Sequence, residues 1–240
     1  MERTRAALIA AGQRLFCERS VDAVTVDDIV GLAEVGKGSF YNHFEDREAL
    51  CRAVTGEIRA RVEDAVERAN ASTDDPAQAV ARGVCTYFRF ALDDPMRAGV
   101  LLRVYGGHTS ICAPLNRGVV ADVSKGLGAG RFAVPTTEAG VLLVLGVAQM
   151  GLARVVQEPV ASFAVALAQQ LCCLMLRGLG VPFAEADLLA SQASDSIVRS
   201  GAYADRSAQP EGGSTPDDGD PEIDGPRRTK KRTKTSKTGT

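Results

Sequence analysis

Apolar residues recur every three or four positions along most of this 240-residue chain, which is the spacing of one face of an α-helix. Residues 3–18 show the spacing first, with Leu8, Ala11, Leu15 and Phe16 along one face. The alternation of apolar and polar residues that marks a half-buried strand is absent from the sequence. The pattern therefore predicts an all-α fold.

Two short helical segments follow this first helix. Thr25 provides a hydroxyl cap for one of them, and Ile29 lies on its apolar side. After a turn at Glu34, the other segment places Phe40 and Phe44 at i,i+4 spacing, pointing inward. Two short helices joined by a tight turn form a helix-turn-helix.

The second of these short helices carries a dense set of hydrogen-bond donors. Its remaining polar side chains are Lys37, Ser39, Tyr41, Asn42 and His43. The second helix of a helix-turn-helix enters a DNA major groove, where lysine and asparagine read purine edges and hydroxyls hold phosphates. On the residues alone, the alternative is that Tyr41 and His43 complete a small helical core.

The run TVDDIVGLAEVGKGSFYNHFEDREAL, Thr25 to Leu50, resembles the DNA-binding segment of the TetR family of bacterial transcriptional regulators. The matching residues, in the family's order and spacing, are Thr25-Val26, Ile29, Ala33, Val35, Gly38-Ser39-Phe40-Tyr41, His43-Phe44 and Glu48 to Leu50. The resemblance implies a three-helix DNA-binding domain at residues 1–52 and an all-α ligand-binding and dimerisation domain at residues 53–200.

The resemblance also implies which residues contact DNA. These are Thr25, Lys37, Gly38, Ser39, Tyr41, Asn42, His43 and Arg47. We expect Lys37 and Asn42 near base edges. The residues expected on the sugar-phosphate backbone are Thr25, Ser39, Tyr41, His43 and Arg47.

This sequence departs from the family's pattern at several positions. Glu34 replaces the glycine of the turn, so a glutamate must adopt a conformation that glycine adopts more easily. Gly36 replaces a small polar residue that would cap the second short helix, and Arg47 replaces the usual lysine. Ser20 replaces a glycine that is usual after the first helix, and Val30 replaces the usual alanine. These changes bear on DNA affinity or target rather than on fold.

The charge of the N-terminal domain does not by itself favour DNA. The chain carries a net charge of −2, and residues 1–52 contain nine acids and seven bases. Attraction to phosphate must therefore come from local placement of Lys37, Arg47, helix N-terminal amides and hydroxyls. Such binding is expected to be sensitive to salt.

Seven further helices are expected, and their predicted ranges are 47–70, 76–92, 96–105, 115–127, 138–156, 160–179 and 184–200, with a loop at 106–114. Residues 139–156 are nearly uncharged, but glycines interrupt them and a membrane span needs about 20 apolar residues, so a buried helix is favoured. The resemblance implies that residues 139–156 and 160–177 form a four-helix interface in a homodimer. The alternative is that they pack within one subunit.

For a ligand pocket the sequence offers only apolar candidates on the central helices. These are Phe88, Leu92, Leu101, Leu102, Tyr105, Met150 and Phe163, each of which has a core role as its alternative. The scarcity of charge among these helices favours an apolar or weakly polar effector. Arg103 and Arg154 either meet an acidic group of the effector or lie on the surface.

Other chemistry is not indicated by the sequence. Five of the six cysteines lie in apolar helical patterns, where a thiol behaves as a small hydrophobe. Cys112 and His108 have i,i+4 spacing without a second ligand pair, so we expect neither a metal nor a cofactor. The stretch KGLGAGRF lacks the strand and full glycine spacing of a phosphate loop. No catalytic constellation is present, and we do not expect an enzyme.

Residues 201–240 are too poor in apolar residues to fold, which predicts a disordered tail. From Asp205 to Asp224 it has seven acids and one base, and from Pro226 onward seven bases and no acid. The basic part is suited to gripping DNA phosphates without reading sequence. The alternatives are a solubilising tail and one that folds back on its own acidic half.

We therefore expect a cytoplasmic, nucleoid-associated homodimeric regulator, most often a repressor in the resembled family, that binds double-stranded DNA at a near-palindromic operator. A small-molecule effector would modulate that binding, and no membrane is involved. One rival is a weakly specific DNA binder whose affinity comes mainly from the tail. Removal of the tail would then abolish DNA binding. The other is a ligand-binding protein with a degenerate DNA-binding domain, in which substitution of Lys37 and Tyr41 would change nothing.

Overall fold

The structure is a computed structural model that describes residues 2–104 and 116–201. These residues belong to one compact unit and form helices and turns without a strand, so the all-α prediction is confirmed. The predicted loop 106–114, Tyr105, Cys112 and the predicted tail beyond Gly201 lie outside the described residues.

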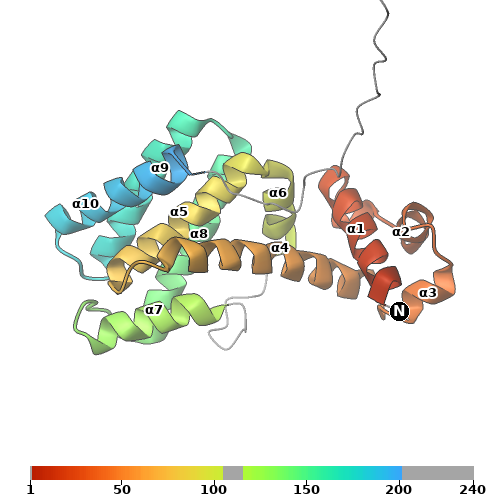
Figure 1. Cartoon of the computed structure of the whole chain (residues 1–240), viewed down its shortest axis with the longest axis horizontal. Coiled ribbons are helices and arrows are strands. Elements are labelled where there is room, and N and C mark those ends of the chain that lie inside the picture. The colour runs from red at the N-terminus through yellow and green to blue at the C-terminus, as the bar shows by residue number, and fades with distance from the viewer. Residues whose placement is uncertain (1, 105–115, 202–240) are drawn as a thin grey trace, which may run out of the picture. The chain divides into compact units, whose positions relative to one another are not determined.

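The N-terminal head, which we define as residues 2–46 with the first turns of the helix that follows, contains three helices. They are α1 (Glu2–Glu18), α2 (Val26–Leu32) and α3 (Lys37–Tyr41), with a 3-10 turn η1 (Val21–Ala23) before α2. In Figure 1 they gather around the beginning of α4 (Arg47–Asn70). Their core includes Phe16, Ile29, Phe40 and Leu50, each 0% exposed. The inward placement predicted for Phe40 is therefore confirmed.

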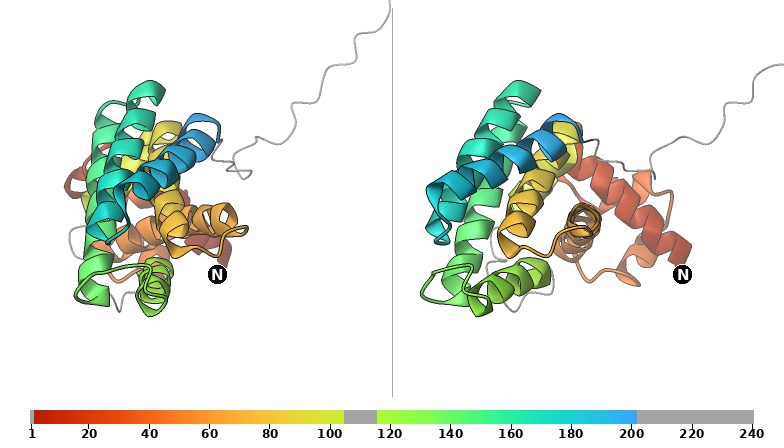
Figure 2. Two further views of the ribbon diagram at one scale, coloured as in Figure 1. Left: turned by 90° about the vertical axis from the view of Figure 1, so that its left-hand side faces the viewer. Right: turned by 60° about the vertical axis from the view of Figure 1, so that its left-hand side comes forward.

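The remaining helices surround α5 (Pro76–Asp93), which contacts α4 and every described helix that follows it. They are α6 (Pro95–Val104), α7 (Arg117–Gly128), α8 (Thr137–Gln157), α9 (Ala161–Gly178) and α10 (Phe183–Ala193). Figure 2 shows α8 and α9 side by side along one side of the bundle. The boundaries follow the predicted ones closely, and the largest shift of a helix start is at α7, which begins at Arg117 rather than 115.

The last predicted helix, 184–200, is divided. The α-helical part ends at Ala193, and a π-helical turn, η3 (Ser194–Arg199), continues it. The hydroxyl of Ser196 donates a hydrogen bond to the Gln192 carbonyl at 2.7 Å, which competes with the regular backbone ladder. Arg89 of α5 binds the Val198 carbonyl at 3.0 Å and holds this turn on the bundle.

Arg131, between α7 and α8, joins three distant segments. Its guanidinium lies 2.9 Å from Asp75 at the start of α5 and 2.6 Å from Glu185 of α10. The hydrogen bonds and charge of Arg131 lower the pKa of Asp75, whose carboxylate also caps α5 through the amide of Ala77 at 3.1 Å. Because that pKa is lowered in the fold, Asp75 stabilises the protein above the ordinary aspartate pKa, and this stabilisation is lost as pH falls through the lowered value.

Buried thiols fill gaps between the helices, as expected. Cys51, Cys85, Cys172 and Cys173 are buried and free. The sulfurs of Cys85 on α5 and Cys172 on α9 lie 3.8 Å apart. The neighbouring thiol, together with burial, raises the pKa of Cys85 and keeps it in the unreactive thiol form.

Phe88 fixes the distance between α5 and α8. Its ring is 0% exposed, and a Cβ on Gly151 would lie 1.9 Å from the Phe88 Cζ. Only glycine therefore allows α8 to approach α5 this closely.

We predict that Gly151→Ala destabilises the protein by about 2 kcal/mol, because the added methyl group forces the Phe88 ring and α8 apart. Gly56→Ala is the control, since a Cβ on Gly56 in α4 meets nothing within 4 Å. It should be stabilising by about 0.5–1 kcal/mol, because alanine is the better helix former. Urea unfolding of both variants measures the difference. Equal stability of the two would contradict this account of the contact.

Candidate DNA-binding surface and ligand cavity

Thr25 starts α2 with a reciprocal capping box. Its hydroxyl oxygen accepts a hydrogen bond from the Asp28 amide at 3.1 Å, and the Asp28 carboxylate accepts one from the Thr25 amide at 2.9 Å. The bonds that Thr25 donates lower the pKa of Asp28. The predicted cap is confirmed, and the Thr25 hydroxyl is already engaged within the head while its side chain remains exposed.

The turn between α2 and α3 has the conformation that the sequence predicts. Glu34 has a φ of 54°, in the left-handed region, and it is the one such residue other than glycine in the part of the chain described. The amide of Val35 bonds to the Val30 carbonyl at 3.1 Å, and that of Glu34 to the Gly31 carbonyl at 3.4 Å. This is a Schellman ending with glutamate at the position where glycine is usual.

α3 is shorter than the predicted second helix, which was expected to carry the donors from Lys37 to His43. Gly36 precedes its first turn and supplies no side-chain cap, and the helix ends at Tyr41. Asn42 and His43 therefore occupy the turn after the helix. The Phe40 ring lies edge-on to the Tyr41 ring, with centroids 5.3 Å apart.

The candidate DNA contacts share one property, which is access to solvent. Thr25, Lys37, Gly38, Tyr41 and Asn42 are exposed, while Ser39, His43 and Arg47 are half-buried. The alternative in which Tyr41 and His43 complete the core is wrong for Tyr41, which is 54% exposed, while His43 is half-buried.

Lys37 has an acidic neighbour that sequence reasoning missed. Its ammonium lies 2.8 Å from the carboxylate of Asp27 on α2, and both side chains are largely exposed. The hydrogen bond to Asp27 and the charge of that carboxylate raise the pKa of Lys37. Phosphate must compete with Asp27 for this cation, although solvent screens an exposed pair of this kind.

Arg47 contributes to the fold of the head. Its guanidinium donates to the carbonyls of Asp22 at 3.0 Å and Val24 at 3.2 Å, and to the Glu48 carboxylate at 2.7 Å. It thereby joins the start of α4 to the segment that enters α2. The predicted phosphate contact at Arg47 would have to share the guanidinium with these partners.

A cavity of about 630 Å³ lies among α4, α5, α6, α7 and α8. Two of the seven predicted ligand residues, Leu101 and Leu102, line it, whereas Leu92 is half-buried and does not. Phe88 is buried against Gly151 instead, Met150 is 65% exposed, and Phe163 packs under Arg154 at 4.9 Å. Tyr105 lies outside the described residues.

The cavity also contains polar residues that the sequence analysis did not select. Arg59 of α4 is buried, and it donates to the side chain of Asn116 at 2.7 Å. The Glu63 carboxylate accepts a hydrogen bond from the Tyr87 hydroxyl at 2.5 Å and lies 3.7 Å from the Arg59 guanidinium. Asp122 of α7 also lines the cavity. The available signal was the occurrence of Arg59 and Glu63 beside the apolar stripe of α4.

The two predicted arginines do not reach the cavity. Arg103 donates to the carbonyls of Phe16 at 2.8 Å and Arg19 at 3.2 Å. Arg154 pairs with Glu158 one turn along α8, at 3.0 Å. Both are therefore occupied elsewhere in the fold.

Two protein-family models match this chain. Residues 8–54 match "Bacterial regulatory proteins, tetR family". Residues 75–192 match "Tetracyclin repressor-like, C-terminal domain".

Relatives of known name match the N-terminal part. The HTH-type transcriptional repressor DhaR of a Mycobacterium species is 34% identical over 95 residues, 40% of this chain and 46% of DhaR. The HTH-type transcriptional regulator TtgR of Pseudomonas putida is 35% identical over 74 residues, 31% of this chain and 35% of TtgR. The chain thus matches less than half the length of either relative.

A solved structure matches over a longer range. The crystal structure of RolR in complex with the ligand resorcinol aligns with a TM-score of 0.58 at 28% identity. The alignment covers 80% of this chain and 94% of RolR.

We predict that Glu34→Gly stabilises the head by about 1 kcal/mol, because glycine adopts the left-handed conformation without the Cβ clash. Glu34→Gln is the matched control, since it removes the charge but keeps the Cβ, and it should leave stability nearly unchanged. Thermal unfolding at neutral pH distinguishes the two. Destabilisation by glycine would show that the left-handed backbone is not strained in this protein.

Proposed function

Because this chain belongs to the TetR family of bacterial transcriptional regulators, we propose that it is a homodimeric DNA-binding regulator, most simply a repressor. In this proposal α3 reads the operator, and a small molecule in the cavity modulates operator affinity. The observation that carries the proposal is that one helix, α4, supplies both the head core and the cavity wall. DhaR, TtgR and the ligand-bound RolR support it by similarity.

The DNA-reading part rests on the outward side of the head. Lys37, Tyr41 and Asn42 are exposed on or directly after α3, within reach of groove edges and phosphates. Thr25, Gly38, Ser39 and His43 would contact the backbone, and Arg47 mainly stabilises the head. We place the protein in the cytoplasm, with the nucleoid as its site of action.

Coupling between ligand and head would pass through α6. Leu101 and Leu102 line the cavity, and the next residue, Arg103, binds two carbonyls at the C-terminal end of α1. A ligand that favours another position of α6 would therefore shift α1 and the head. The effect on operator affinity equals the ligand's preference between the two states.

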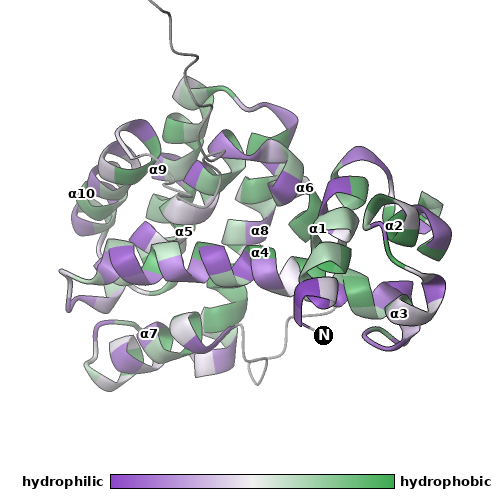
Figure 3. Cartoon of the chain, turned by 45° about the vertical axis from the view of Figure 1, so that its right-hand side comes forward, coloured by the Kyte–Doolittle hydropathy of each residue, from purple (hydrophilic) through white to green (hydrophobic). Residues whose placement is uncertain are grey.

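The homodimer would use the outer faces of α8 and α9. Exposed residues recur at four-residue spacing on each helix, and they are uncharged: Leu142, Gly146 and Met150 on α8, and Ala166, Gln170 and Leu174 on α9. Both helices are long and apolar enough to cross a membrane, yet only 33% and 39% of their apolar windows are buried within the chain. Figure 3 shows mainly apolar colouring along α8. A second copy would cover this surface symmetrically.

A second candidate function is ligand binding without operator binding. It is favoured by the Lys37–Asp27 pair and by the engagement of Arg47 within the head, which leave fewer cations for phosphate. The two candidates differ in whether the wild-type protein selects a DNA sequence and in whether the α3 surface reads it.

We predict that combining Lys37→Ala with Tyr41→Phe weakens binding to a duplex selected by the wild-type protein by about 100-fold, because one charged and one hydroxyl contact are lost. The salt dependence of binding should become shallower, by about one phosphate contact. Fluorescence anisotropy at two or more salt concentrations measures both effects. Lys125→Ala, at an exposed lysine of α7, is the control and should bind like wild type. Wild-type affinity in the double variant would show that α3 does not read the duplex, whereas the second candidate predicts that the wild-type protein selects no duplex.

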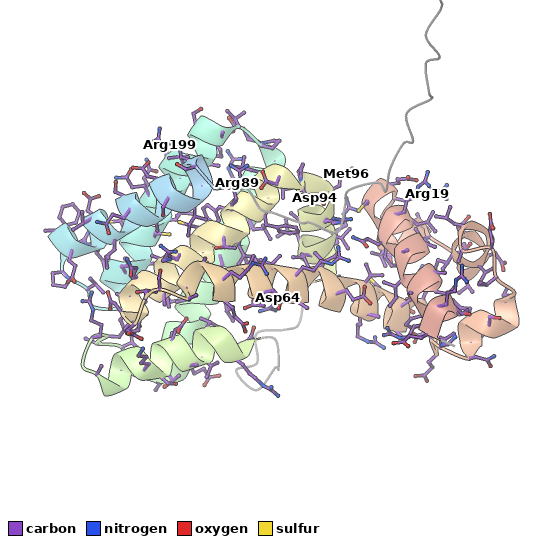
Figure 4. All side chains as sticks on the ribbon, viewed as in Figure 1. Arg19, Asp64, Arg89, Asp94, Met96 and Arg199 are labelled. Carbon is purple, nitrogen blue, oxygen red and sulfur yellow. The ribbon has the colours of Figure 1, made fainter. Side chains whose placement is uncertain are left out.

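We predict that Leu142→Glu combined with Met150→Glu converts the dimer to monomer, because four carboxylates would then face one another across the interface. Light scattering at a fixed protein concentration measures this. Met96→Glu is the control, since Met96 is also exposed, at 54%, but lies on α6 (Figure 4). If the protein stays dimeric with the double substitution but becomes monomeric with Met96→Glu, the interface does not lie on α8.

A further inference from the structure

Glu63 directs one of its two carboxylate oxygens across the cavity. Its Oε1 is held by the Tyr87 hydroxyl, at 2.5 Å, and faces the Arg59 guanidinium, at 3.7 Å. Its Oε2 lies 3.7 Å from the position that a Cβ on Gly118 would occupy. This second oxygen therefore points at α7.

Asp122 follows Gly118 by one turn and so lies on the same side of α7. Asp122 lines the cavity and is half-buried. Within residues 2–104 and 116–201 no side chain or backbone amide donates a hydrogen bond to it. The neighbouring Lys125 is exposed and lies 3.9 Å from Asp74. Burial and, more weakly, the charge of Glu63 raise the pKa of Asp122, while Lys125 opposes them.

The cavity wall as a whole is negatively charged, like Glu63 and Asp122 themselves. Its acidic residues are Glu63, Asp64, Glu67 and Asp122, and its basic residues are Arg59 and Arg117. Arg59 is already bound to Asn116 and Glu63, and Arg117 is exposed. Figure 4 shows Asp64 on α4. The cavity lining thus has Glu63 on α4 and Asp122 on α7, and Arg59 forms an ion pair with Glu63.

The rest of the wall is apolar. Leu101 and Leu102 of α6 and Val144, Leu145 and Leu152 of α8 line it. The volume of about 630 Å³ is within the range that holds drug-sized molecules. A fitting ligand therefore combines an apolar body with a group that satisfies the two carboxylates.

We propose that the effector is an amphipathic organic cation. Its protonated amine or amidine lies between Glu63 and Asp122, and its apolar body lies against α6 and α8. This inference rests on the proposed function, because it assigns the ligand of the same cavity.

A positive charge suits the site better than a neutral hydroxyl. Two facing carboxylates repel each other, and a cation between them relieves that repulsion. Hydrogen bonds between ionised partners are also roughly twice as strong as those between neutral groups. A neutral phenol such as resorcinol, which is the ligand bound to RolR, can donate to Asp122 but leaves the negative charge uncompensated.

Three probes that share a naphthalene body test the charge. They are naphthylmethylamine, naphthylmethanol and naphthoic acid, titrated calorimetrically at neutral pH into the full-length protein without DNA. We expect the amine to bind about tenfold more tightly than the alcohol, because its hydrogen bonds to the carboxylates join ionised partners. The acid should bind most weakly, because the carboxylates repel it.

Variants then locate the effect. Asp122→Asn keeps the side-chain shape and should lower amine affinity about tenfold while leaving alcohol affinity unchanged. Asp187→Asn removes an exposed carboxylate on α10, away from the cavity, and should keep the preference for the amine. Because Asp122 has no partner among the described residues, its replacement should not unfold the protein, and circular dichroism checks this.

The inference is overturned if the alcohol or the acid binds as tightly as the amine, if none of the probes binds, or if Asp122→Asn retains the full preference. Operator binding by the unliganded protein does not depend on these results. Failure of the proposed function would instead appear as loss of sequence-specific DNA binding in the same preparation.

Discussion

Helix α4 determines where the head and the cavity lie relative to each other. Asp46 caps it through the Ala49 amide at 2.6 Å, and the helix continues without a break to Asn70. At 1.5 Å per residue its 24 residues span about 36 Å. Its first turns complete the head core, whereas Arg59 and Glu63 belong to the cavity. The domain boundary predicted at residue 52 falls inside this helix, so the two functions share one rigid element.

Arg103 adds a second tie at the other end of the head. It satisfies two carbonyls at the end of α1, which would otherwise have no partner within the helix. The residues just before it on α6 line the cavity. A ligand therefore meets a wall that is bonded directly to the head, and a small shift of α6 has a path to α3 through α1 and α2.

The electrostatics of the two regions follow one principle, which is that local pairing matters more than net charge. In the head, Asp27 holds Lys37 and the fold holds Arg47, so non-specific attraction to phosphate is reduced. Binding then depends on a matching groove surface. In the cavity, Arg59 is held by Asn116 and Glu63, while Asp122 has no comparable partner among the described residues.

The helices and their caps were predictable from the sequence because periodicity and capping are local. Thr25 caps α2 as expected, Asp46 and Thr136 cap α4 and α8 in the same way, and Glu34 takes the strained conformation that its place in the turn predicts. The cavity was not predictable, because periodicity identifies an apolar face but not where two faces separate. Phe88 and Leu101 are equally plausible pocket residues in the sequence. In the structure the Phe88 ring packs against Gly151, whereas Leu101 lines the cavity.

The central claim is that this protein reads a DNA sequence as a two-fold dimer through α3. Selection of bound duplexes from a random pool, with the full-length protein and residues 1–204 in parallel, tests it most directly. We predict that both enrich the same near-palindromic motif, with half-sites spaced by about one helical turn or a multiple of it. Enrichment of no motif by either protein, with salt-sensitive binding by the full-length chain alone, would contradict the claim and assign the DNA affinity to the basic tail.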